Sequence, residues 1–164
     1  MAKSDKKQSK AAVDPNERPI TENRKARHKF EVLDTLECGL ALVGSEVKSL
    51  RNGKVSLDEA YVRVKDDEVW LIGCDIQEYT HAATMNHDPR RPRKLLLHRR
   101  EIKKFAQSAY EKGLTLAPLK LYFKRGRAKL LVGLCRGLKK FDKREKLKEK
   151  TVKRDIDRAH KQRR

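Results

Sequence analysis

The feature that most constrains the fold is a long alternation of apolar and polar residues near the carboxyl end of the chain. In residues 119–124, Leu, Leu and Phe alternate with Lys, Tyr and Lys, and in residues 128–134 apolar residues occupy every second position. This period is typical of β-strands with one buried face. Arg125 and Gly126 lie between the two runs, and glycine accepts the positive φ of a tight turn. The sequence therefore predicts an antiparallel hairpin.

Four more apolar-rich segments predict further strands. Residues 61–64 and 69–76 flank an acidic turn and form a second predicted hairpin, while residues 30–36 and 40–50 flank Gly39. Six short strands at close spacing favour a mainly β protein, folded as a small antiparallel barrel that is closed or nearly closed.

One segment follows a helical period instead. Ile102, Phe105, Ala106 and Ala109 share one face of a predicted helix, and Gly113 is suited to end it. We expect this helix to cover one open end of the barrel. Small barrels with a helix between strand groups include the oligonucleotide-binding (OB) architecture, which does not by itself assign a function.

Positive charge is concentrated at the two ends of the chain. Lys and Arg number 42 against 23 Asp and Glu, so the formal net charge is +19. Residues 137–164 alone contribute +8 of it, yet they contain few apolar residues. We predict a disordered basic extension over residues 1–22, the barrel over residues 23–136, and a tail over residues 137–164 that is disordered when free and folds on a polyanion.

The sequence offers little support for catalysis, a metal site or a membrane segment. Cys38, Cys74 and Cys135 lie far apart without Cys-x-x-Cys spacing, which argues against zinc and favours buried thiols in a reducing compartment. No apolar run approaches the ~20 residues of a membrane helix, and the start lacks a secretory signal, so we expect a cytoplasmic protein without metal or cofactor. His87-Asp88 precedes a proline, which favours a turn; an RNA-processing enzyme that uses these two residues is an open alternative.

Basic clusters recur beside the predicted strands and loops. They lie at residues 24–29, 90–94, 98–104 and 124–129, in addition to the tail. Such clusters favour binding to nucleic acid, with an affinity that falls steeply with salt. The Phe, Trp and Tyr residues form no series that looks exposed, so recognition of a folded RNA fits better than stacking on single strands. A structural ribosomal protein, also basic and tailed, is the other open alternative.

Residues 86–98, NHDPRRPRKLLLH, place four basic residues directly before three leucines. Pro89 and Pro92 disfavour a helix, which predicts an extended loop with its basic side chains exposed. These side chains are Arg90, Arg91, Arg93 and Lys94. We expect the leucines to begin the covering helix and to anchor the loop on the barrel.

Five motifs in this order resemble the SsrA-binding proteins, also called the small protein B family. They are NRKARHKF (23–30), GSEVKSLRNGK (44–54), RKLLLH (93–98), G-x-T-L-x-P-L-x-L-Y-F (113–123) and GLCRG with FDKR (133–144). The resemblance implies an OB-type barrel with flanking helices and a flexible basic C-terminal tail. It also implies an RNA-binding protein of trans-translation that is not an enzyme.

The resemblance implies specific partners. Such a protein binds the tRNA-like domain of transfer-messenger RNA (tmRNA, SsrA) and delivers it to stalled ribosomes, where the nascent chain is rescued and tagged. The barrel and the RNA together imitate a tRNA, while the tail becomes helical in the empty mRNA channel near the decoding centre. Elongation factor Tu and alanyl-tRNA synthetase are implied as indirect partners through the RNA. We expect the protein to be a monomer.

The resemblance also assigns residues to the RNA. The positions carried over from its motifs are Asn23, Glu37, Leu96 and Lys129. Motif position and charge add Arg24, Lys25, Arg27, His28, Lys48, Arg51, Arg93 and Lys94. Because a carboxylate repels phosphate, Glu37, which we expect in a turn, would accept from base or sugar donors or orient a neighbouring arginine. Leu96 would be the one leucine of its segment that faces RNA.

In the tail, the resemblance implies a ribosome-binding segment. Its members are Gly137, Lys139, Lys140, Phe141, Asp142, Lys143 and Arg144. Family members usually have two lysines after the glycine, and His or Tyr before Asp-Lys-Arg. Here Leu138 removes one phosphate contact, which Lys140 can restore, and Phe141 keeps an aromatic ring without a polar atom.

Overall fold

Nine strands and three helices form the part of the chain that this computed structural model describes, namely residues 16–82, 86–111 and 113–138. In chain order they are β1 (Glu17–Glu22), α1 (Arg24–Lys29), β2 (Phe30–Leu40), α2 (Gly44–Arg51), β3 (Val55–Ser56), β4 (Tyr61–Lys65), β5 (Glu68–Ile72), β6 (Asp75–Ile76), β7 (Arg93–Leu96), α3 (Arg99–Glu111), β8 (Thr115–Lys124) and β9 (Arg127–Gly137). Within the described ranges, none of the helices has the length and apolar character that a membrane crossing requires. The predicted mainly β fold is confirmed.

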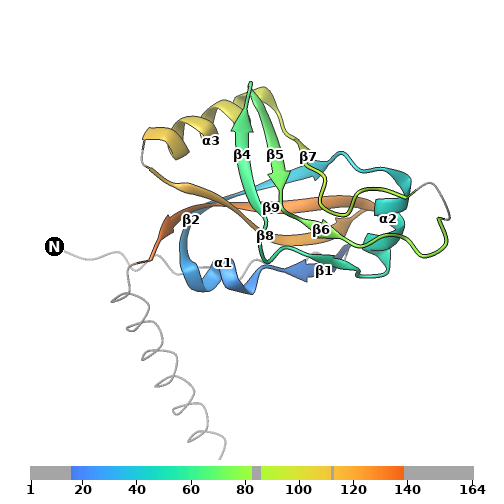
Figure 1. Cartoon of the computed structure of the whole chain (residues 1–164). Coiled ribbons are helices and arrows are strands. Elements are labelled where there is room, and N and C mark those ends of the chain that lie inside the picture. The colour runs from blue at the N-terminus through green and yellow to red at the C-terminus, as the bar shows by residue number, and fades with distance from the viewer. Residues whose placement is uncertain (1–15, 83–85, 112, 139–164) are drawn as a thin grey trace, which may run out of the picture.

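Seven strands form one antiparallel sheet in the order β1-β8-β9-β2-β7-β5-β4, and β3 pairs with β6 separately. β4, at one edge, also packs against β8 near the other edge, so the sheet curls into a small OB-type barrel (Figure 1). Helix α3 inserts Ile102 and Phe105 into the barrel core, as predicted for the covering helix. Gly113 follows this helix with a φ of +57°, in agreement with its predicted role at the helix end.

Both predicted hairpins are confirmed, but the predicted strand over residues 69–76 is wrong beyond Ile72, because residues 75–76 form β6, which pairs with β3. The β8–β9 turn consists of Arg125 and Gly126, with φ values of +49° and +74°. The β4–β5 turn consists of Asp66 and Asp67, with φ values of +53° and +57°. Two consecutive residues with positive φ match the twist of the flanking strands, which favours two-residue hairpin turns of this kind.

A register shift in β8 divides its apolar side chains between two clusters. Leu121 and Phe123 face the barrel interior, whereas Leu119 faces the outer surface beneath α1. The outer cluster consists of Ala26, Ala117, Leu119 and Cys135. The simple alternation, which put Leu119 on the same face as Leu121, is wrong because the shift adds one residue before Lys120. Gly133 makes room for this arrangement, since a Cβ there would lie 2.8 Å from Cδ1 of Leu119.

The predicted strand over residues 40–50 is wrong, because most of this segment forms helix α2. Val43, Val47 and Leu50 recur at helical spacing, and Leu50 is only 1% exposed. The Glu46 carboxylate accepts a hydrogen bond from the backbone N–H of Val43 at 2.9 Å, which satisfies a donor at the start of the helix.

The predicted boundary of the disordered N-terminal extension is also wrong. Residues 17–22 form β1, which pairs with β8 from Glu17 opposite Lys124 to Glu22 opposite Lys120. This polar segment has little to bury, but its backbone groups pair with the otherwise open edge of β8. Residues 1–15 lie outside the described part of the chain.

All three cysteines are buried and free, as predicted. The Cys38 thiol donates to the backbone oxygen of Leu130 at 3.1 Å. Burial raises the pKa of Cys38 to about 12 and that of Cys74 to about 11, so both thiols stay protonated at neutral pH. Among the described residues, no group of three or more His, Cys, Asp or Glu side chains is placed to hold a metal ion.

Candidate nucleic-acid interface

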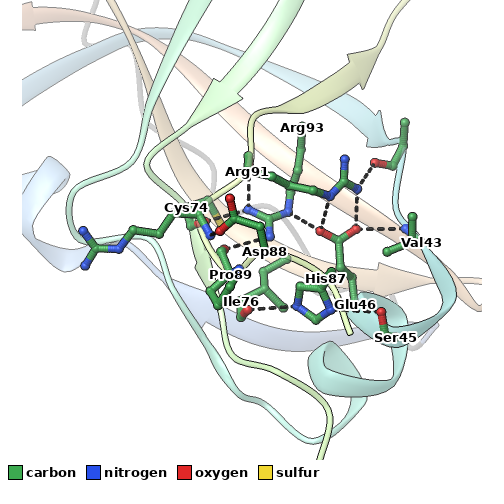
Figure 2. A network of polar contacts seen from close by, with 12 residues as sticks. Val43, Ser45, Glu46, Cys74, Ile76, His87, Asp88, Pro89, Arg91 and Arg93 are labelled. Atoms are coloured by element: carbon green, nitrogen blue, oxygen red, sulfur yellow. Dashed lines mark hydrogen bonds and ion pairs between the residues drawn. The ribbon is translucent and has the colours of Figure 1, made fainter. Parts of the chain in front are cut away.

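The basic segment 86–98 is built into the fold, and the predicted exposure of Arg93 is wrong. The Arg93 side chain has no exposed surface. Its guanidinium donates to Glu46 Oε1 at 2.8 Å and to the backbone oxygens of Cys74 and Pro89 at 2.6 and 2.9 Å (Figure 2). A buried guanidinium needs acceptors for its fixed fork of donors, and these three groups provide them together with the backbone oxygen of Arg91 at 3.1 Å.

Glu46 of α2 is the acceptor at the centre of this network (Figure 2). Besides Arg93, its fully buried carboxylate accepts two hydrogen bonds from Arg91, at 2.5 and 2.8 Å. Burial raises the pKa of Glu46, but the hydrogen bonds from Arg91 and Val43 and the charge of Arg93 outweigh it, so the pKa lies below its ordinary value. The network fastens the loop before β7 to α2.

His87 and Asp88 belong to the same structural network. Nδ1 of the buried His87 lies 2.9 Å from Ser45 Oγ, and Nε2 lies 3.0 Å from the backbone oxygen of Ile76. The Asp88 carboxylate accepts from the backbone N–H of Arg90 at 2.9 Å, which is the geometry of an aspartate-initiated turn. The interpretation of this pair as a turn is confirmed.

The three leucines of the segment do not begin the covering helix, because β7 contains two of them and α3 starts only at Arg99. Leu95 is 2% exposed and faces the core, whereas Leu96 is 53% exposed on the outer face, as the alternation along a strand requires. Leu96 is paired with Gly39 of β2, where a Cβ would lie 3.3 Å from the Leu96 Cβ. The outward orientation of Leu96 is confirmed; its contact with RNA stays a prediction.

Glu37 lies within β2 on the outer face of the sheet, so its predicted place in a turn is wrong. The Tyr122 hydroxyl donates to its carboxylate at 2.6 Å, and the ammonium groups of Lys124 and Lys129 lie 3.1 and 3.5 Å away. The Tyr122 hydrogen bond is the largest cause that lowers the pKa of Glu37, and the two lysines add to it against partial burial. The carboxylate therefore holds two cations on the outer face.

Tyr122 and Lys124 were missed as site residues by the sequence analysis. The signal for Tyr122 was present in the predicted hairpin, because a two-residue turn at Arg125-Gly126 pairs Tyr122 with Lys129. The contact between Tyr122 and Glu37 depends on the position of β2 beside β9. No local sequence pattern predicts that strand order.

Replacing Tyr122 with phenylalanine should raise the pKa of Glu37 towards its ordinary value of 4.5, because the strongest donor is removed. With a lowered pKa, the contribution of Glu37 to stability is present above pH 4.5 and is lost as the pH falls through the lower folded value. In the variant this contribution should therefore be smaller at neutral pH and should be gone at a higher pH than in the wild type. Carboxyl titration by NMR measures the pKa of Glu37 directly. The exposed Tyr61, replaced with phenylalanine, is the control, and an unchanged pKa in the Tyr122 variant would contradict the prediction.

Asn23 has a structural role, since its side chain is only 3% exposed. Its Oδ1 accepts from the N–H of Ala26 at 2.8 Å, which caps α1, and its Nδ2 donates to the backbone oxygen of Leu57 at 2.8 Å. Its own N–H donates to Leu119 of β8 at 2.8 Å. Asn23 thus fixes α1 to the barrel, and the expectation that it faces RNA does not agree with its burial.

The remaining predicted cations are exposed on two helices. They are Arg24, Lys25, Arg27 and His28 on α1, and Lys48 and Arg51 on α2. Lys25 forms an ion pair with Asp58 at 2.8 Å, and the Lys48 ammonium lies 5.3 Å from the centre of the Tyr79 ring. Figure 1 shows α1 and α2 well apart along the barrel, so these cations do not form one cluster.

The comparison with known protein families decides which of the sequence interpretations applies. The family model described as SmpB protein matches residues 20–162 of the chain. The chain belongs to the SmpB protein family. The SsrA-binding protein of Rhodopirellula baltica is 56% identical over 146 residues, which cover 88% of this chain and 83% of the relative. That of Thermosynechococcus vestitus is 50% identical over 145 residues, covering 88% and 95%. The resemblance found in the sequence is confirmed.

A solved SmpB structure agrees with the barrel described above. It was reported as "tmRNA-SmpB: a journey to the center of the bacterial ribosome". Its sequence is 48% identical to this chain, and the two structures superpose with a TM-score of 0.63. The similarity covers 77% of this chain and 93% of the solved one.

The described part of the chain ends at Leu138, beside the end of α1. Gly137 ends β9 opposite Phe30, and the N–H of Leu138 donates to the backbone oxygen of Lys29 at 3.0 Å. The other residues predicted to bind the ribosome lie outside the described part of the chain. They are Lys139, Lys140, Phe141, Asp142, Lys143 and Arg144.

Proposed function

We propose that this protein binds the tRNA-like domain of transfer-messenger RNA and delivers it to stalled ribosomes in trans-translation, a form of translation quality control. The observation that carries the proposal is the similarity over most of the chain to proteins that are named for binding SsrA RNA. The net charge of +19 supports a polyanionic partner.

The proposed RNA-binding surface combines α1 with an outer sheet face, which we define as the outward residues of β8, β9, β2 and β7. On this face Lys129 pairs with Gly39, and Gly39 pairs with Leu96, so a cation and an exposed apolar side chain lie on the two strands that flank β2. The Glu37 carboxylate orients Lys129, and its negative charge is balanced by the surrounding donors. Phosphate would contact the lysines, and Leu96 would contact a base or sugar.

Arg93 and Asn23 are left out of the proposed contact surface because their side chains are buried. They act instead as positioning residues: Arg93 holds the loop that precedes β7, and Asn23 holds the start of α1. Lys94 remains in the surface, although it forms an ion pair with Glu68.

The proposed role of the tail rests on the similarity to the SsrA-binding proteins and to the solved structure. We infer that residues 137–164 enter the empty mRNA channel near the decoding centre and become helical there, while the barrel and the RNA take the place of a tRNA. Elongation factor Tu and alanyl-tRNA synthetase would act through the RNA. The proposal needs a cytoplasmic monomer that binds RNA without catalysing a reaction on it. Both ring nitrogens of His87 have structural partners, which disfavours the RNA-processing alternative.

Band shifts should show tighter binding to the tRNA-like domain of transfer-messenger RNA than to an elongator tRNA. Replacing Lys129 with glutamine should weaken binding and reduce the salt slope by about one, because one phosphate contact is lost. The exposed Lys103 on α3, replaced in the same way, is the matched control and should leave both unchanged.

Equal affinity for the two RNAs would contradict the proposed specificity. The ribosomal-protein alternative makes a different prediction, since such a protein co-sediments stoichiometrically with all ribosomes. A rescue factor should be substoichiometric and enriched on stalled ribosomes.

A further inference from the structure

The outer surface of the barrel continues past Leu96 into a groove over β4 and β5. The groove has a volume of about 320 Å³. Its lining residues are Arg63, Lys65, Asp66, Glu68, Trp70, Ile72 and Pro92. None of them was assigned to RNA by the sequence analysis.

Trp70 lies at the centre of a cross-strand row that crosses this groove. It pairs with Arg63 of β4 on one side and with Lys94 of β7 on the other. Its neighbours Val69 and Leu71 are buried in the core, so Trp70 faces outward, where it is half-buried. The indole is therefore flanked on both adjacent strands by a basic residue.

The groove is continuous with the outer sheet face of the proposed function. Lys94 and Leu96 are two residues apart on β7 and share its outer side. Leu96 pairs with Gly39, which in turn pairs with Lys129. A nucleic acid that contacts Lys129 and Leu96 can thus reach Trp70 without leaving the surface of the sheet.

The groove offers contacts for a nucleobase of two kinds, apolar and hydrogen-bonding. Trp70, Ile72 and Pro92 supply apolar surface for a flat ring. The carboxylates of Asp66 and Glu68 can accept from the amino and imino groups of a base. Glu68 also pairs with Lys94 and Asp66 with Lys65, and each carboxylate has further lone pairs that can accept from a base.

Arg63 supplies the charge for a phosphate next to such a base. Among the residues that the structure describes, it takes part in no ion pair or hydrogen bond through its side chain, so its guanidinium is available. A guanidinium binds phosphate through two parallel N–H donors. The groove therefore offers stacking and phosphate contacts side by side, which favours RNA over an acidic peptide.

We propose that this groove binds one unpaired nucleobase of transfer-messenger RNA, which stacks on Trp70 while Arg63 contacts an adjoining phosphate. The inference rests on the proposed function and deepens it by adding a stacking site to a surface that combines cations with the exposed Leu96. Stacking on one aromatic side chain corresponds to about a 5- to 150-fold change in affinity when the ring is removed.

Trp70 is the only tryptophan of the chain, so its fluorescence reports on this groove alone. The full chain is titrated with the tRNA-like domain, and band shift and tryptophan fluorescence are measured in the same samples. We expect quenching to follow the band shift. Trp70→Ala should weaken binding by about 5- to 150-fold, and Trp70→Phe, which keeps a ring, should retain most of the affinity. Tyr110→Ala, at a residue 92% exposed on α3, is the aromatic control and should bind like the wild type.

Three outcomes would overturn the inference. A band shift without fluorescence change, with wild-type affinity in Trp70→Ala, removes the groove from the interface and leaves the proposed function intact. Fluorescence that responds to ribosomes without transfer-messenger RNA, but not to the RNA, assigns the groove to a ribosomal partner. The absence of any band shift with the wild-type chain overturns the proposed function and the inference together. Circular dichroism of each variant shows whether a loss of binding reflects unfolding.

Discussion

Replacing Glu46 with alanine should lower the free energy of unfolding by about 3–5 kcal/mol, because it leaves a buried cation without its partner. Glu46 and Arg93 are both fully buried, and their side chains are 2.8 Å apart. The variant keeps the Arg93 guanidinium in the interior with backbone oxygens alone as acceptors. Urea unfolding, followed by circular dichroism, measures the difference in free energy between wild type and variant.

The matched control is the exposed ion pair between Glu31 and Arg136, whose atoms lie 3.1 Å apart. Replacing Glu31 with alanine should cost less than about 1 kcal/mol, because solvent screens both charges. Since the pKa of Glu46 is lowered, its stabilising effect is present above pH 4.5 and is lost as the pH falls through the folded value. The wild-type advantage should therefore shrink in acid. Equal losses in the two variants would show that the buried network contributes no more than a surface pair.

A chain that ends at Leu138 should bind transfer-messenger RNA like the full chain but fail to support tagging on stalled ribosomes. The cut retains the pairing of Gly137 with Phe30 and the hydrogen bond from Leu138 to Lys29, so the barrel is complete. It removes residues 139–164, which hold all of the net charge of +8 of the tail. Band shifts measure RNA binding, and a reconstituted translation reaction on an mRNA without a stop codon measures tagging.

A full-length chain whose residues 139–164 are scrambled is the control for charge. It should also fail in tagging if the order of the tail residues, and not their charge alone, is read by the ribosome. Loss of RNA binding in the truncated chain would contradict the division of labour between barrel and tail. Normal tagging by the truncated chain would remove the tail from the mechanism.

Local patterns predicted the parts of the fold that depend on local forces. The hairpin at Arg125-Gly126 and the acidic turn at Asp66-Asp67 follow from backbone φ preferences, which act within a few residues. The face of α3 that contains Ile102 and Phe105 follows from the helical period. Residues 40–50 were misassigned because an apolar-rich segment of this length is compatible with both a strand and a helix.

The sequence predicted several residues of the candidate site, but it did not predict which of their side chains are exposed. Family motifs identified Leu96 and Lys129, and the structure places both near each other on the outer sheet face. The same motifs also contain Asn23 and Arg93, which the structure buries. A motif marks a residue by its position and leaves open whether the side chain contacts a partner or supports the fold. Trp70 had no motif, and its outward position became visible only in the sheet.

By itself the sequence determined a basic, mainly β barrel of the SmpB family, because strand period, turn chemistry, charge and motifs are all properties of neighbouring residues. Only the tertiary structure decided which charges face the solvent. Arg93 is buried because its carboxylate partner, Glu46, lies 47 positions earlier in the chain and meets it only after α2 packs beside β7. Leu119 faces α1 because β8 shifts register against β9. Burial depends on contacts between distant segments, and such contacts have no local signature.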